Sequence, residues 1–237
     1  MRVLTLIFTL CAMPMMALAG DFDHSHAAFT TLLSSRVSDG RVDYTAIKAN
    51  KELDAYLGQL EDVYDFDGWT EDQKLAYWIN AYNAYTLKLI ISYMPVDSIR
   101  DINWPLQPWD VSFIVLQGHK YTLNNLEHDI VRGQFAEPRI HFALVCASTG
   151  CPPLRSEAFT AAKLDAQLED QARVFLNDPT KNRVEGGVLY LSKIFSWFGE
   201  DFKKGGGYRK FVNKRLDGAS AATSESFQSY DWTLNGQ

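Results

Sequence analysis

The chain is poor in cysteine, in basic charge and in long apolar segments. It has three cysteines among 237 residues, and no two of them have the two-residue spacing of thioredoxin-like redox pairs. Its 23 basic and 29 acidic residues give a formal net charge of −6, with no basic stripe that would attract nucleic acid. After the amino-terminal segment, no stretch is both long and free of polar groups, so we expect no stable membrane insertion.

The amino terminus has the pattern of a secretory signal peptide. Arg2 provides a short positive start, residues 3–16 are apolar apart from two threonines, and residues 17–19 offer small side chains where a signal peptidase reads them. We expect cleavage after Ala19. Residues 1–19 would then be the signal peptide and residues 20–237 a single soluble domain, periplasmic or secreted.

The clearest secondary-structure signal is a helix from Glu71 to Met94. Thr70 and Gln73 form a capping box ahead of it, and Pro95 ends it. Its apolar residues surround nearly the whole cylinder, which predicts a central, buried helix.

Asn80 and Asn83 share one face of that helix, inside the predicted core. Buried amides need partners, because an unpaired polar group costs about 1 to 3 kcal/mol. Two interpretations stay open. The two side chains either bind the backbone of a neighbouring loop, or they line a pocket and polarise a substrate.

The remaining patterns predict an α+β fold with several helices around a small, mainly antiparallel sheet. Further helices are expected at residues 27–37, 46–60, 126–132, 163–176 and 192–202. Hairpins are expected at residues 111–123 and 182–192, and single strands at residues 140–145 and 230–235. No internal repeat and no long linker divides the chain, so we expect one domain.

No residue pattern calls for a cofactor or a metal. His24 and His26 lie near the amino end without a further histidine or cysteine nearby to complete a coordination shell. We expect both to be solvated.

Cys146 and Cys151 stand in a loop that directly follows the predicted strand at residues 140–145, and the helix upstream presents Glu127 and His128. A thiol, an imidazole and a carboxylate in neighbouring elements are the parts of an activated-cysteine site. A free thiol titrates near pH ~8.5, and a histidine within hydrogen-bond reach lowers that value. We therefore predict Cys146 as nucleophile and His128 as its base.

The group that would orient His128 is left open by the sequence. Adjacent helical residues diverge by about 100°, so Glu127 does not easily face His128. Glu127 also stands three residues after Asn124, where it would close a helix cap. It is either a cap or a site carboxylate. Other residues that could orient the imidazole are Asn80, Asn83 and Asp231.

His141 is an unfavourable base for Cys146 if residues 140–145 are extended. Side chains on a strand alternate faces and rise about 3.3 Å per residue, which would put these two residues on opposite sides and about 16 Å apart. His141 is then expected to be a partly buried histidine that bonds across the sheet.

The same two cysteines also suit a small disulfide loop. In an oxidising compartment Cys146 and Cys151 could form a structural or regulatory disulfide, which would silence Cys146. The small residues between them, Ser148 to Gly150, would leave backbone N–H groups free to hold an oxyanion.

Several segments of the chain, in this order, resemble the bacterial secreted members of the family called domain of unknown function 547. They are GRVDYTAIKA, YWINAYNAYTLKLI, EHDIVR, PRIHFALVCASTGCPPLR, IFSWFGEDF and YDWTLN. The resemblance spans nearly the whole chain after residue 19. It implies a mixed helical and sheet domain in which the Glu127–His128 pair and a cysteine near position 146 recur, whereas Cys151 and His141 vary more.

By analogy, the resemblance suggests papain-like or transglutaminase-like cysteine enzymes. One departure stands out. Those enzymes place the nucleophile at the start of a helix, whereas Cys146 precedes a loop that contains Pro152 and Pro153.

Two functions follow as hypotheses. The first is an exported cysteine hydrolase or acyl transferase that acts on a peptide, another amide or a thioester, with Cys146 attacking, His128 shuttling the proton, and Glu127 or an asparagine orienting the ring. The second is a non-catalytic exported binding module, with a Cys146–Cys151 disulfide and with tryptophans that form core and ligand contacts. Those tryptophans are Trp78, Trp104, Trp109 and Trp197.

Overall fold

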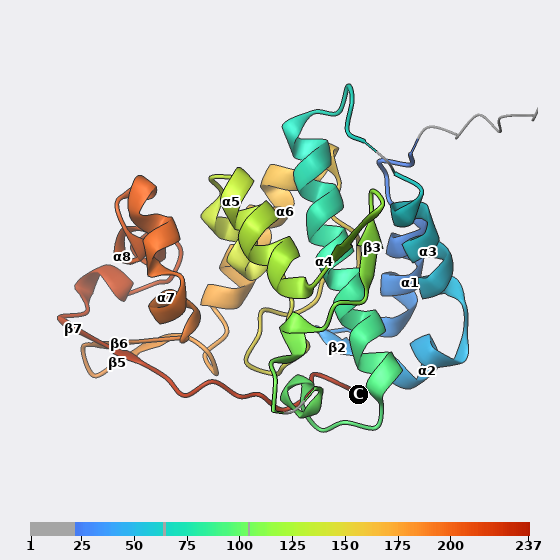
Figure 1. The fold of residues 1–237 in the computed structure, drawn as a ribbon. Helices are drawn as coiled ribbons and strands as arrows, with labels where there is room; N and C mark the ends of the chain where they lie inside the picture. The colour runs from blue at the N-terminus through green and yellow to red at the C-terminus, as the bar shows by residue number, and fades with distance from the viewer. Residues whose placement is uncertain (1–21, 64, 104) are drawn as a thin grey trace, which may run out of the picture.

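Short helices surround one long helix in the computed structural model, which describes residues 22–63, 65–103 and 105–237 (Figure 1). The predicted signal peptide, residues 1–19, and Trp104 lie outside the described residues. The combination of many helices with small, mainly antiparallel sheets confirms the predicted α+β class.

The long helix is α4 (Glu71–Tyr93), and its prediction is confirmed. The Thr70 hydroxyl accepts a hydrogen bond from the Gln73 backbone N–H, and the Gln73 side chain accepts one from the Thr70 N–H. Most of the helix is buried on every side, because other helices and loops pack around it. Pro95 follows two residues after its end and cannot continue the helix.

The amino-terminal part packs on one side of α4. Its elements are α1 (Ala27–Arg36), the strands β1 (Val37–Ser38) and β2 (Arg41–Val42), and the helices α2 (Tyr44–Ala49) and α3 (Glu52–Glu61). The two helical patterns expected in this region are confirmed, the second one as two helices.

The expectation that His26 is solvated is wrong. The residue is 1% exposed, and its ring nitrogen Nδ1 lies 2.7 Å from the Tyr56 hydroxyl. His26 adopts a left-handed backbone conformation with φ of 48° directly before α1, and this turns its ring inward between α1 and α3.

Both predicted hairpins are present. They are β3 (Ile114–Leu116) with β4 (His119–Tyr121), and β5 (Arg183–Glu185) with β6 (Val188–Leu191). The closing strand was predicted at residues 230–235, and this placement is wrong. Strand β7 (Ser224–Phe227) comes earlier and pairs parallel to β6, whereas the later segment makes only two isolated bridges, Ser148 to Leu234 and Val42 to Gly236.

The strand predicted at residues 140–145 is also wrong. Residues Pro138–Phe142 form a 3₁₀-helix, η4. Pro138 occupies its first turn and the Glu137 side chain caps it by accepting a hydrogen bond from the Arg139 N–H, which favours a helical start. A short apolar run is compatible with either a buried strand or a buried helix, so the apolar residues at 140–145 did not distinguish the two.

The remaining elements follow α4 along the chain. They are η1 (Ile99–Asp101), η2 (Pro108–Asp110), the π-helix η3 (Asn125–Val131), α5 (Arg132–Gln134), η5 (Ala161–Lys163), α6 (Leu164–Leu176), α7 (Ile194–Trp197), η6 (Gly199–Gly205), α8 (Tyr208–Asn213) and η7 (Ala219–Ala221). The helix expected at residues 192–202 is split into α7 and η6.

Two clusters of buried hydrophobic side chains form the core. The larger one surrounds α4, and the smaller one joins the end of α6, β6, α7, η6 and α8. The carboxy-terminal segment, residues 228–237, runs from the smaller cluster to the larger one along the lower edge of the view in Figure 1. Among the described residues, no helix combines the length and the hydropathy needed to cross a membrane.

Candidate functional site

A cavity of about 200 Å³ lies where the two hydrophobic clusters meet. Four of the predicted site residues line it, namely Glu127, His128, Cys146 and Cys151. The other lining residues are Tyr82, Trp109, Asn124, His141, Leu144, Pro152, Ile194, Trp197, Phe198, Tyr230 and Trp232. The Cys146 sulfur and the His128 imidazole therefore line the same cavity, and the reach of one to the other stays a prediction.

The helix that carries Glu127 and His128 does not begin as expected. Asn124 makes no capping hydrogen bond. Thr122 and Asn125 cap the chain reciprocally instead, because the Asn125 side chain accepts from the Thr122 N–H and the Thr122 hydroxyl accepts from the Asn125 N–H. The interpretation of Glu127 as a cap for Asn124 is wrong. The Glu127 side chain lines the cavity instead.

The same helix is a π-helix, which makes its turns wider than those of an α-helix. The Arg132 N–H donates to the Glu127 carbonyl five residues earlier. π-helical turns inside helices are frequent at functional sites. In this case, two consecutive side chains, Glu127 and His128, both line the cavity.

The Glu127 carboxylate is hydrogen-bonded to the buried hydroxyl of Tyr82 on α4. Burial, together with the charge and hydrogen bond of Glu127, holds the pKa of Tyr82 well above its ordinary value. Tyr82 is therefore a neutral donor that fixes the position of Glu127.

The His128 ring is held by Arg132. The guanidinium Nη1 lies 2.9 Å from the ring nitrogen Nδ1. Because arginine has no acceptor, Nδ1 must accept this bond, and the neutral ring carries its proton on Nε2. In this arrangement His128 can donate a hydrogen bond, rather than accept a proton, at its other nitrogen.

A second imidazole lines the cavity and has a carboxylate partner. His141 Nε2 lies 2.7 Å from Asp201 Oδ2, and the His141 ring stacks on Phe198 with ring centroids 4.1 Å apart. Asp201 also receives two hydrogen bonds from Arg132, at 2.7 and 2.9 Å. The hydrogen bonds from His141 and Arg132 hold the pKa of Asp201 well below its ordinary value.

Nε2 of the neutral His141 ring donates its hydrogen to the Asp201 carboxylate, so Nδ1 is the nitrogen that can accept a hydrogen bond. None of the hydrogen bonds within the described ranges uses this nitrogen. The expectation of a cross-sheet bond is wrong, because His141 lies on a 3₁₀-helix and pairs with η6. Asp201 is not among the predicted site residues, and its only signal in the sequence is its place in the segment IFSWFGEDF, which carries the family resemblance.

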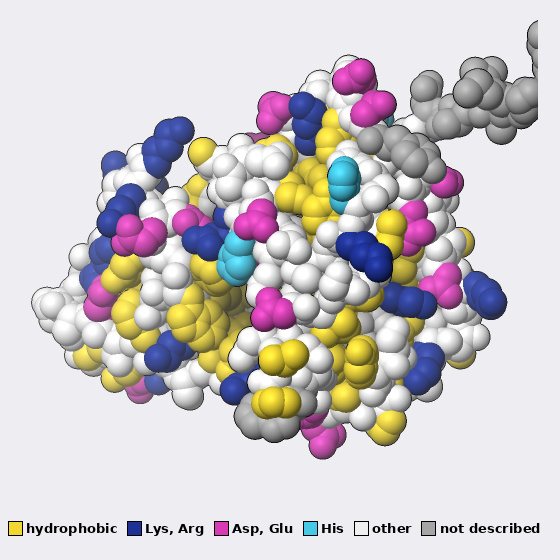
Figure 2. Space-filling view, viewed as in Figure 1, with side chains coloured by type: hydrophobic (Ala, Val, Ile, Leu, Met, Phe, Trp, Pro, Cys, Tyr) yellow, Lys and Arg dark blue, Asp and Glu magenta, His cyan; other side chains and the backbone are white. Residues whose placement is uncertain are grey.

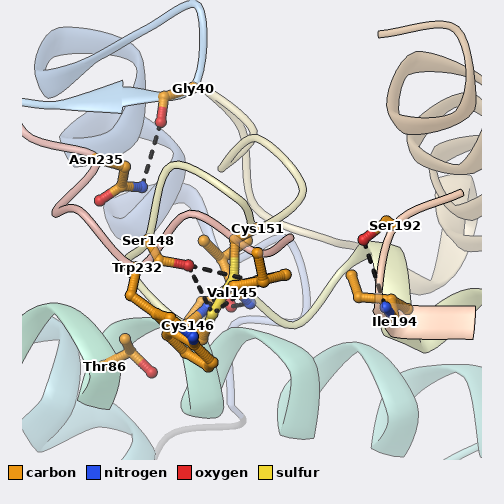
Figure 3. Close-up of a disulfide and its surroundings, with 12 residues drawn as sticks. Gly40, Thr86, Val145, Cys146, Ser148, Cys151, Ser192, Ile194, Trp232 and Asn235 are labelled. Carbon is orange, nitrogen blue, oxygen red and sulfur yellow. Dashed lines mark hydrogen bonds between the residues drawn. A yellow bond between two sulfur atoms is a disulfide. The ribbon is translucent and has the colours of Figure 1, made fainter. Parts of the chain in front are cut away.

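The sulfur atoms of Cys146 and Cys151 form a disulfide, with Cα atoms 6.2 Å apart (Figure 3). Cys151 is buried and Cys146 is half-buried. The Cys146 sulfur also contacts the Ser148 hydroxyl at 3.2 Å and the Tyr230 hydroxyl at 3.3 Å.

The prediction that backbone N–H groups from Ser148 to Gly150 are free for an oxyanion is wrong for Thr149 and Gly150. The Thr149 N–H donates to the Thr233 carbonyl at 2.7 Å, and the Gly150 N–H donates to the Asp231 carbonyl at 2.8 Å. The carboxy-terminal segment therefore holds the cysteine loop and occupies these donors. Ser148 is 2% exposed and reaches the cavity only through its contacts with Cys146 and Tyr230.

The two core asparagines lie outside the cavity lining. The Asn83 side chain donates to the Ala143 carbonyl at 2.9 Å and accepts from the Val145 N–H at 2.9 Å. Asn80 makes the same pair of bonds with the Phe159 backbone, at 2.7 and 2.9 Å. These contacts match the first interpretation, in which the amides bind loop backbone. Asp231 also lies outside the lining and accepts from the Thr233 N–H.

Aromatic rings form much of the remaining wall. Trp197 is 45% exposed and stands at the surface, while Trp109, Tyr230 and Trp232 are half-buried. On the face shown in Figure 2, hydrophobic side chains are exposed near a histidine that has both acidic and basic neighbours. Within the described ranges no group of three or more His, Cys, Asp or Glu side chains is arranged to hold a metal ion.

These features define an α+β protein whose cavity is lined by a disulfide, by aromatic rings and by a histidine that is hydrogen-bonded to a carboxylate outside the lining. Residues 66–176 match the family model described as "Protein of unknown function, DUF547", which supports assignment of the chain to that family. The matched segment contains α4, η3 and the cysteine loop, whereas Asp201, Trp197 and Trp232 lie beyond it. The comparisons with curated proteins and with solved structures found no match, so the analogy to papain-like enzymes stays a prediction.

Proposed function

We propose that the protein is an exported cysteine-dependent hydrolase or acyl transferase that acts on amide or thioester bonds. The observation that carries the proposal is that Cys146 and His141 line one cavity, and that His141 is hydrogen-bonded to Asp201. Export through residues 1–19 is part of the proposal. An oxidising compartment suits the Cys146–Cys151 disulfide, which is the inactive form in this scheme.

Activation requires reduction of that bond. A dithiol reductant supplies two electrons and two protons, which converts the disulfide to two thiols while the reductant becomes a disulfide. Both cysteines line the cavity, and Cys146, which is less buried than Cys151, is the thiol beside Tyr230 and Ser148.

In the reaction, His141 Nδ1 takes the proton of the Cys146 thiol. The thiolate adds to the carbonyl carbon, and the leaving amine or thiol departs with the proton from His141, which leaves an acyl thioester on Cys146. Water, or an acceptor amine or alcohol, loses a proton to His141 and attacks the thioester. This step releases the acyl product and restores the thiol.

The contacts of the two histidines support separate roles. Asp201 leaves His141 as an acceptor, so His141 suits the base. Arg132 leaves His128 with a proton on Nε2, so His128 suits a donor to the oxyanion, in place of the occupied loop N–H groups. The role of His128 as proton shuttle stays a prediction, and the same experiment distinguishes the two histidines.

The test is the alkylation rate of Cys146 with iodoacetamide at neutral pH, measured by mass spectrometry. We expect Cys151→Ser protein to react at Cys146 about tenfold or more faster than the same chain in denaturant, because the thiol pKa is lowered. Adding His141→Ala should remove this advantage, whereas adding His128→Ala should leave most of it. A folded Cys151→Ser protein that reacts no faster than the denatured chain would rule the proposal out.

A second candidate, a non-catalytic exported binding module, is favoured by the disulfide itself, since a bonded sulfur cannot attack. Mass spectrometry of protein isolated without reductant from the producing cells distinguishes the two. Fully reduced cysteines would remove the main support for the binding module. A quantitative disulfide, together with no hydrolysis of amide or thioester substrates after reduction, would favour it.

A further inference from the structure

The aromatic wall of the cavity is built from three separate segments. Trp109 comes from η2, Trp197 from α7, and Tyr230 with Trp232 from the carboxy-terminal segment. Their rings contact one another, with centroids 5.7 Å apart for Trp109 and Trp232, 4.9 Å for Trp197 and Tyr230, and 5.9 Å for Trp197 and Trp232. The faces of such rings carry negative potential, which attracts cations. Trp232 already holds one, since the Arg100 guanidinium lies 5.4 Å from its centroid.

Glu127 adds a full negative charge beside this wall. Glu127 and Trp109 both interact with the Tyr82 hydroxyl, and all three residues line the cavity. Burial raises the pKa of Tyr230, and the charge of Glu127 raises it further, so the carboxylate also acts on the second side of the wall. None of the ion pairs in the described part of the chain includes Glu127.

The basic groups near Glu127 are engaged elsewhere. Arg132 gives its bidentate bond to Asp201 and a further bond to His128. In its neutral form His128 carries no charge to offset Glu127. The cavity therefore combines aromatic faces with a carboxylate that makes none of the ion pairs in the described part of the chain and whose cationic neighbour, Arg132, is bonded to Asp201 and His128.

We infer that this cavity binds a cationic group, a primary or methylated ammonium, whose charge faces Glu127 and whose alkyl surface lies against Trp109, Trp197 and Trp232. Rings of this kind around an ammonium group form the aromatic cages that recognise choline and methylated lysine. The inference builds on the proposed function in one respect, because the cation would belong to the amide or thioester substrate. Neutral ligands such as sugar or aromatic rings would also pack on the wall, but they would lack the attraction between opposite charges that a cation has to Glu127.

Binding of choline and of its neutral isostere 3,3-dimethyl-1-butanol distinguishes these classes of ligand. Both are titrated into the oxidised full-length protein, and binding is followed by tryptophan fluorescence and by calorimetry. The two probes have nearly the same shape and differ in charge. We expect choline to bind about tenfold or more tightly than the alcohol, with an affinity that falls as salt is added.

Two variants connect this preference to the wall. Glu127→Gln keeps an acceptor for Tyr82 but removes the charge, and we expect it to weaken choline about tenfold with little effect on the alcohol. Trp197→Leu changes a ring at the surface and should weaken choline without unfolding the protein. The matched control is Glu185→Gln, which removes an exposed carboxylate on β5 away from the cavity. Equal affinity for the two probes, no detectable choline binding, or an unchanged affinity in Glu127→Gln would each overturn the inference.

The outcome is independent of the thiol chemistry, because the oxidised protein has no free thiol. Preferential choline binding together with an unreactive Cys146 in Cys151→Ser protein would remove the proposed enzyme and keep the cation site. A reactive Cys146 together with no charge preference would do the reverse.

Discussion

The ring nitrogen Nε2 of His141 lies 2.7 Å from Oδ2 of Asp201, although the two residues are 60 positions apart in the chain. His141 is on η4, which packs with α6, and Asp201 is on η6 beside α8. Their bond therefore joins η4, which brings His141 to the cavity wall, to η6. In the proposed enzyme, it fixes the nitrogen that accepts the proton.

Asp201→Asn tests this bond in the proposed enzyme. The amide can no longer stabilise a protonated His141, and general-base catalysis of this kind contributes about 10²- to 10⁴-fold. We expect the reduced protein to lose activity on a thioester substrate by a factor in that range. We also expect the pH at which the alkylation rate of Cys146 is half of its maximum to shift upward. Asp165→Asn, an exposed carboxylate paired with Arg139, is the matched control and should behave as wild type. An unchanged pH profile in Asp201→Asn would contradict the assignment.

Asn83→Ala should destabilise the protein through the cysteine loop. The variant leaves the Ala143 carbonyl and the Val145 N–H buried without partners, and each such loss costs about 1 to 3 kcal/mol. We expect the free energy of unfolding in urea to fall by about 2 to 4 kcal/mol. Asn213→Ala, an exposed residue on α8, should change it by less than about 0.5 kcal/mol. A loss for Asn83→Ala no larger than this control would contradict the anchoring role.

His26 predicts a loss of stability on acidification. Burial lowers its pKa in the folded protein to about 4, against 6.5 for an unperturbed histidine. Between these values the unfolded chain binds a proton that the folded chain does not, so stability is complete above pH 6.5 and falls toward pH 4. The loss from this residue is about 3 kcal/mol.

The measurement is urea unfolding at several pH values in that range. His26→Gln should reduce the slope of stability against pH. His119→Gln, which replaces an exposed histidine on β4, should leave the slope unchanged. Parallel slopes in wild type and His26→Gln would show that the histidine is not buried in its neutral form.

Gly150→Ala should displace the carboxy-terminal segment. An added Cβ would lie 2.9 Å from the Asp231 carbonyl oxygen and 3.1 Å from the Tyr230 ring. The same Asp231 carbonyl accepts the hydrogen bond of the Gly150 N–H. We therefore expect the free energy of unfolding to fall by about 1 to 3 kcal/mol and the fluorescence of Trp232 to change. Gly58→Ala is the control with the opposite sign, since nothing lies within 4 Å of its Cβ and alanine should stabilise α3 by about 0.5 to 1 kcal/mol. Equal stability of the two variants would contradict the close approach.

Local patterns were enough to predict much of the fold. The capping box at Thr70 and the proline at position 95 specify α4 through contacts within a few residues, and the paired glycines at 186–187 specify a hairpin in the same way. The cysteine loop and the Glu127–His128 pair were also visible as chemistry, because residue types alone identify a thiol, an imidazole and a carboxylate.

The partners of these groups depend on contacts between distant segments, which no local pattern encodes. The apolar run at residues 140–145 is typical of a buried strand. In the structure, the Asn83 side chain makes the backbone hydrogen bonds that a neighbouring strand would have made. The 3₁₀-helix η4 puts His141 in the cavity wall, and Asp201 comes to it from 60 residues further along the chain. The residue types in the sequence therefore identified the reactive groups. Long-range packing determined which histidine nitrogen can accept a hydrogen bond and which backbone N–H groups of the cysteine loop are already bonded.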